Sequence, residues 1–213
     1  MSLARMIKAL YTGGGTEVER NLVTDRRSHL LVSGGIPGYS ELARRGNGWS
    51  AMNTTALAAL VVRPSTVANC TLFNNEPEGG KTYIVARAFA FNLVTTAAQG
   101  RSGLWLCTHP KGLVSPTNDI TARGSNSCKA NYGGRAIIDT GMTVTDNGWF
   151  PWGGQIDVEV TGVLPGGNLD ASEMRGMLLV PPQCGISTQV ISSVVGNTFT
   201  SGFYWFEEQF DME

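Results

Sequence analysis

Short runs of β-branched and aromatic residues, separated by turn-forming residues, recur along the chain from about residue 57. Such punctuation is typical of antiparallel β-proteins. The expected strands, in chain order, are 57–63, 66–73, 82–94, 103–108, 135–139, 143–146, 155–162, 174–180, 186–195 and 198–206. So many short strands predict an all-β fold, an antiparallel β-sandwich of jelly-roll type.

The last two runs are separated only by Gly196-Asn197. This pair suits a two-residue hairpin turn, so we expect residues 186–195 and 198–206 to pair as a β-hairpin. Alternation in the final run places Phe199, Phe203 and Trp205 on one face and Tyr204 and Phe206 on the other.

The run from 82 to 94 is apolar on both of its faces. Strict alternation puts Tyr83, Val85, Phe89, Phe91 and Leu93 on one side and Ile84, Ala86, Ala88, Ala90 and Val94 on the other. Because a sandwich buries only one face of a strand, the outer face needs further cover. From the sandwich we therefore select as candidate subunit-interface residues Tyr83, Phe89, Phe91, Tyr204 and Phe206.

Residues 1–56 show little sustained periodicity and are predicted to form an N-terminal arm before a sandwich domain at 57–213. Near its start, Leu3, Met6, Ile7 and Leu10 follow helical spacing, which predicts a short amphipathic helix. A helix this short is unstable alone in water and requires a docking surface. These four residues complete the set of interface candidates.

Charged residues make up 15% of the chain, against about 25% in a typical soluble protein. This depletion is typical of surfaces covered by identical neighbours, although a Gly-rich β-protein with a quiet surface would also show it. Residues 1–50 carry seven Lys and Arg against four Asp and Glu. That excess is too small to predict nucleic-acid binding, and we expect the arm to dock on acidic surface that includes Glu207 and Glu208.

The start of the sequence lacks the long apolar core and cleavage site of a secretory signal, and no run reaches 18 apolar residues. We therefore predict no signal peptide, no membrane partner and synthesis in a cytoplasm. The four cysteines, Cys70, Cys107, Cys128 and Cys184, show no CxxC spacing. Each is expected to be a small buried apolar residue with a reduced thiol.

The sequence gives little sign of catalysis. His29 and His109 are the two histidines, and neither accompanies a GxSxG elbow or a Ser-His-acid order. Cys107 and His109 supply at most two metal ligands, and the spacing favours a buried Cys beside an exposed loop His. Asp157 and Glu159 share a strand face as glycosidase carboxylates can, but a solvated edge explains them equally. We predict no enzyme, no metal and no cofactor.

Trp149-Phe150-Pro151-Trp152 is expected to lie in a loop. Two readings remain: Trp149 and Trp152 stack on sugar rings, or the cluster is an aromatic plug that closes the sandwich or fills a subunit contact. The pattern favours the plug.

A basic Gly-rich arm, a charge-poor jelly-roll-like body and the closing stretch VISSVVGNTFTSGFYWFEEQ resemble virion structural proteins of tailed bacteriophages. The resemblance implies a noncatalytic head decoration or cementing subunit, located in the virion, that forms homotrimers and contacts the major capsid protein. Two alternatives stay open: a carbohydrate- or receptor-binding module of a tail or fibre, and a small jelly-roll capsid subunit, whose basic arm would usually be denser. A β-sandwich hydrolase is a third, weaker hypothesis.

Overall fold

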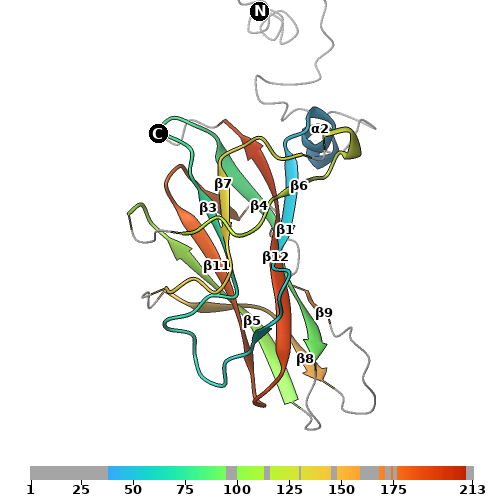
Figure 1. Ribbon diagram of the computed structural model, residues 1–213, viewed down its shortest axis with the longest axis vertical. Coiled ribbons are helices and arrows are strands. Elements are labelled where there is room, and N and C mark those ends of the chain that lie inside the picture. Colours follow the sequence, from blue (N-terminus) through green and yellow to red (C-terminus); the bar gives the residue numbers. More distant parts are fainter. Residues whose placement is uncertain are drawn as a thin grey trace, which may run out of the picture.

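Two antiparallel sheets pack face to face in the computed structural model of this chain (Figure 1). The structure describes residues 38–94, 100–112, 116–129, 131–144, 148–158, 168–170, 174 and 177–209. Sheet A contains β1 (Gly48–Met52), β2 (Leu57–Ala58), β4 (Thr82–Val94), β6 (Arg123–Gly124), β9 (Asn168–Asp170), β10 (Leu178–Val180) and β12 (Thr198–Glu208). Sheet B contains β3 (Cys70–Asn74), β5 (Gly100–His109), β7 (Ala136–Asp139), β8 (Phe150–Val158) and β11 (Gly185–Ser192). The helices among the described residues are α2 (Gly38–Arg45) and the 3₁₀ turn η1 (Ser127–Lys129). The all-β sandwich prediction is confirmed.

The strand pairing is nested: strands from the start of the sandwich pair with strands from its end, and inner strands pair with inner strands. The pairs, from the outermost inward, are β1 with β12, β3 with β11, β4 with β10, and β5 with β8. The resulting orders, β10-β4-β12-β1 in sheet A and β3-β11-β5-β8 in sheet B, are those of an eight-stranded jelly roll. β6 and β7 extend the outer edges of β1 and β3.

The predicted hairpin at Gly196-Asn197 is wrong. β11 lies in sheet B and β12 in sheet A, so the chain crosses between the sheets instead of turning back within one. The crossing is fixed by the side chain of Asn197, which donates to Ser192 Oγ at 3.0 Å, and by Leu60, whose backbone bonds to β11. Local turn chemistry cannot reveal this, because the partners of both strands are distant in sequence.

A β-bulge in β4 changes which side chains face the core. Arg87 pairs with Tyr204 and Val85 with Trp205, which leaves Ala86 without a partner in β12. Because side chains alternate, one extra residue exchanges the two faces beyond it. The prediction that Phe89 and Phe91 share a face with Tyr83 is therefore wrong: the two phenylalanines lie on the outer face.

The core lies between the sheets and is closed by large aromatic side chains from β12. Trp205, Phe203 and Phe199 are fully buried, as the predicted alternation of this strand requires. They pack with Tyr83 and Val85 of β4 in one cluster. Sheet B contributes to the same cluster Cys70, Leu72, Leu104, Leu106, Ile138, Ile186 and Val190.

Part of the predicted arm belongs to the sandwich. β1 is paired with β12 along its whole length, and α2 precedes it. Asn53 follows β1, and its buried side chain accepts a hydrogen bond from the backbone of Ser201. The sandwich thus includes residues that the sequence assigned to the arm, and residues 1–37 lie outside the described part of the chain.

We expect Gly202→Ala to destabilise the fold by at least about 2 kcal/mol. A Cβ at Gly202 would collide with the carbonyl oxygen of Ala51 and lie 2.8 Å from Met52 Cα and 2.9 Å from the Phe89 ring. Urea unfolding measures the loss.

Gly103→Ala is the matched control, because a Cβ there meets nothing within 4 Å. It also removes a strand glycine, so it should be neutral or slightly stabilising. Equal loss in both variants would contradict the close approach at Gly202.

Candidate binding groove

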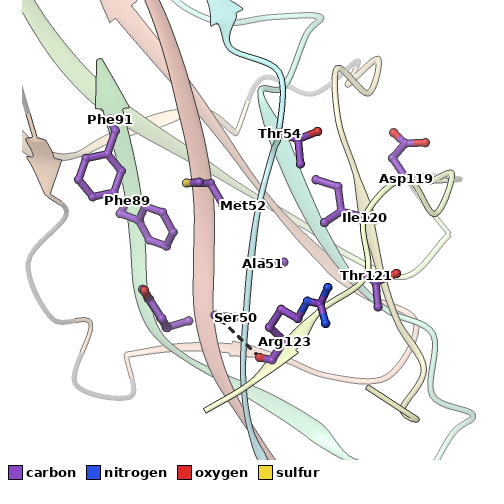
Figure 2. Close-up of a pocket in the computed structure, with 11 residues that line it drawn as sticks. Ser50, Ala51, Met52, Thr54, Phe89, Phe91, Asp119, Ile120, Thr121 and Arg123 are labelled. Atoms are coloured by element: carbon purple, nitrogen blue, oxygen red, sulfur yellow. Dashed lines mark hydrogen bonds between the residues drawn. The ribbon is translucent and has the colours of Figure 1, made fainter. Parts of the chain in front are cut away.

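An open groove of about 640 Å³ crosses the outer face of sheet A (Figure 2). Phe89 and Phe91 of β4 lie on one side of it and Arg123 of β6 on the other. The remaining lining residues are Ser50, Ala51, Met52, Thr54, Asp119, Ile120, Thr121 and Tyr204. The groove therefore spans four neighbouring strands, β4, β12, β1 and β6, and the segment before β6.

Aromatic rings form one wall of the groove. The ring of Phe89 lies 5.1 Å from that of Tyr204 and 5.6 Å from that of Phe91, centroid to centroid. Tyr204 remains 42% exposed, and so does Met52 beside it, whereas Phe89 is 4% exposed. Exposed large apolar side chains that cluster over a rigid buried ring are typical of a binding surface.

The opposite wall is mostly polar, with Ile120 as its apolar residue. Ser50 Oγ donates to the carbonyl oxygen of Arg123 at 3.4 Å, which ties β1 to the edge strand. The Asp119 carboxylate accepts two hydrogen bonds from Thr140, from its backbone N at 2.9 Å and from its hydroxyl at 3.0 Å. An apolar floor with one basic and one acidic side chain at its rim suits an amphipathic partner better than a uniformly charged one.

The structure brings some predicted interface residues together and separates others. Phe89, Phe91 and Tyr204 meet in the groove. Phe206 lies on the same outer face, where Tyr39 of α2 stacks on its ring at 4.8 Å. Tyr83 is fully buried between the sheets, so it presents no surface to a partner. Leu3, Met6, Ile7 and Leu10 lie outside the described residues.

Sequence reasoning missed the wall formed by Ile120 and Arg123. Residues 109–134 carry no sustained periodicity, and β6 is only two residues long, so no local pattern predicts their place. Met52 was missed for a different reason, because β1 was assigned to the arm. The available signal was the order of residue types in GWSAM, in which apolar Trp49 and Ala51 flank polar Ser50 as in a short strand.

The two tryptophans of the carbohydrate hypothesis do not form a common platform. Trp149 is 2% exposed and packs with Cys107 and Met142 on the outer side of sheet B. Trp152, two residues into β8, packs against the main core on the inner side, with Phe150 5.7 Å from its ring. Phe150 to Trp152 belong to β8 and Trp149 directly precedes that strand, so most of the segment is strand rather than loop.

His109 is buried rather than exposed in a loop. It ends β5, where its Nε2 lies 2.7 Å from Ser187 Oγ and its Nδ1 3.9 Å from Cys107 Sγ. Ser187 Oγ in turn lies 2.6 Å from Thr71 Oγ1. A Ser-His pair resembles part of a hydrolytic site, but all four side chains are buried, so a substrate has no approach to the hydroxyl.

Glu207 is also buried, which corrects its assignment to an acidic surface. It is 1% exposed and accepts hydrogen bonds from Tyr132 Oη at 2.7 Å, Lys81 Nζ at 3.2 Å and Trp205 Nε1 at 3.4 Å. Burial, followed by the nearby Glu207 carboxylate, raises the pKa of the Tyr132 phenol. The network satisfies a buried carboxylate at the end of β12, as such a charge requires.

The described residues contain no group of three His, Cys, Asp or Glu side chains that could hold a metal ion. The paired carboxylates proposed at Asp157 and Glu159 fall where the structure describes no side chains. Among the described helices, none is long and apolar enough to cross a membrane.

All four cysteines are free thiols, but they differ in exposure. Cys70 and Cys107 are buried, Cys184 is partly buried and Cys128 is exposed. The expectation of four buried cysteines therefore fails at Cys128. Burial raises the pKa of the Cys70 thiol, which further lowers its reactivity.

Comparison of the chain with protein-family models and with curated proteins gave no match.

Tyr132→Phe should lower the free energy of unfolding by about 1–3 kcal/mol. The variant removes the shortest of the three hydrogen bonds to the buried Glu207 carboxylate. It also removes the acceptor of the Ala136 N–H, which donates to Tyr132 Oη at 2.6 Å. Tyr39→Phe, at a residue 43% exposed, is the control and should change stability little. Equal urea midpoints for Tyr132→Phe and the unmodified chain would contradict the network.

A thiol reagent such as DTNB should react with the native protein first at Cys128 and much more slowly at Cys70 and Cys107. Exposure and thiolate fraction set these rates. Cys128→Ser should remove the fast phase and leave the slow phases. A fast phase that survives this substitution would show that one of the other thiols is accessible.

Proposed function

We propose that this chain is a noncatalytic structural subunit of a virus particle that works by self-association through the outer face of sheet A. The groove lined by Phe89, Phe91, Tyr204 and Met52 carries the proposal, because it is an apolar surface that the described chain leaves open. The jelly roll adds support, since this architecture is common among viral capsid domains.

The topology favours one role within that class. Jelly rolls of eight strands occur among viral capsid domains, so the nested pairing supports a small shell-forming capsid subunit. A decoration or cementing subunit, which the sequence resemblance implies, shares the need for a self-association surface. The two roles differ in whether the protein forms a closed particle alone or only binds a shell made by another protein.

The carbohydrate-binding alternative loses its main support, because Trp149 and Trp152 are packed on opposite sides of sheet B. The hydrolase hypothesis gains none from the Ser187 and His109 pair, which is enclosed. The groove itself offers rings to a ligand, but its lining comes from four strands of one sheet and forms an extended, open surface.

Size-exclusion chromatography with light scattering of the full-length protein tests self-association. We expect an oligomer, with a trimer favoured for a decoration subunit, or closed particles visible by negative-stain electron microscopy for a shell subunit. A monodisperse monomer over the accessible concentration range would contradict the proposal.

Tyr204→Ser should weaken association about tenfold or more, because aromatic side chains at the centre of an interface carry much of its binding energy. Val62→Ser is the matched control: Val62 is 66% exposed and does not line the groove. If both variants associate as the unmodified chain does, the groove is not the contact.

A further inference from the structure

The groove needs an occupant, and the chain carries a segment with matching chemistry. Leu3, Met6, Ile7 and Leu10 have the i, i+3, i+4, i+7 spacing with which an amphipathic helix anchors in an apolar groove. We propose that the Leu3–Leu10 segment of a neighbouring copy binds in the groove on sheet A. This inference rests on the proposed self-association and names the segment that makes the contact.

The dimensions of segment and groove agree. Seven helical steps from Leu3 to Leu10 measure about 10 Å. Along β12, the four residue steps from Thr200, which pairs with Phe91, to Tyr204 measure about 13 Å. One short helix therefore matches the length of the aromatic wall.

The polarity of the segment also fits. On a helical wheel Arg5 and Lys8 fall opposite the four apolar anchors, so docking buries the apolar side and leaves both charges at the surface. The side of the helix that faces solvent would then be charged, like the neighbouring groove wall with Asp119 and Arg123. A helix this short lacks stability alone, and burial of four apolar side chains supplies it.

The chain enters the described fold on the same face as the groove. Tyr39, next to the first residue of α2, stacks on Phe206, and Phe206 follows Tyr204 on the outer side of β12. The 27 residues from 11 to 37 separate the segment from this point. Extended, they reach at most about 90 Å, whereas a domain of this size measures roughly 40 Å across. The connection is far longer than its own groove requires and long enough to reach a neighbour.

Site-specific photo-crosslinking in the full-length chain tests the contact. With p-benzoylphenylalanine in place of Met52, illumination should join position 52 to peptides from residues 1–12. When ¹⁵N-labelled and unlabelled copies assemble together, the joined peptides should carry mixed labels. The same probe at Val195, which is 74% exposed and outside the groove, should not capture these peptides.

Two charge-matched variants sharpen the test. Ile7→Asp should lower the crosslinking yield at least about tenfold, because it places a carboxylate on the anchoring face. Thr12→Asp adds the same charge on the opposite face and should leave the yield unchanged. Both positions precede the described fold, and equal melting temperatures would show that folding is unaffected.

The other outcomes of the crosslinking experiment would contradict either the contact or the proposed function. Crosslinks only within one chain, or only to groove residues of a second copy, would overturn the inference. Absence of crosslinks to residues 1–12 in a sample that light scattering shows to be assembled would also overturn it, yet leave the proposed function standing. A monomer by light scattering would instead remove the proposed function itself.

Discussion

The irregular pairing of β4 with β12 is the constraint on which the surface of this molecule depends. These two strands form the longest ladder in sheet A, and Ala86, which has no partner in β12, reverses the facing of β4 partway along it. Small Ala88 and Ala90 then fill the space between the sheets, where Trp205 and Phe203 need room. Phe89 and Phe91 are left on the outer face. The core and the groove are thus two consequences of one inserted residue.

Gly202 completes the arrangement. Its missing side chain lets β1 and β12 approach and lets the Phe89 ring lie over them. A ring held in this way is nearly buried, while Tyr204 and Met52 beside it stay partly exposed. Because the Phe89 ring is already held in place, little conformational entropy is lost when a partner binds over it. This pre-organisation favours specific binding.

The sequence predicts those features of the fold that depend on the residues of a single strand. Residues 82–94 were predicted with the boundaries they have, and the alternation of Phe199, Tyr204 and Trp205 was right. Prediction from the sequence fails for features that depend on which distant strands pair. Gly196-Asn197 has the chemistry of a hairpin turn, yet the nested jelly roll sends β11 and β12 to different sheets. The bulge at Ala86 and the short strand β6 depend on partners far along the chain, so no local pattern marks them. Phe89, Phe91 and Tyr204 were among the predicted interface candidates, although Phe89 and Phe91 were assigned to the face of buried Tyr83, whereas Met52 and Arg123 were not among them.

Oxidation footprinting of Met52 tests most directly whether the outer face of sheet A is a contact between copies. Met177, 68% exposed and outside the groove, serves as the internal reference in the same sample. As protein concentration rises, we predict that oxidation of Met52 slows markedly while that of Met177 does not. Equal oxidation of Met52 in dilute and in assembled protein would contradict the account.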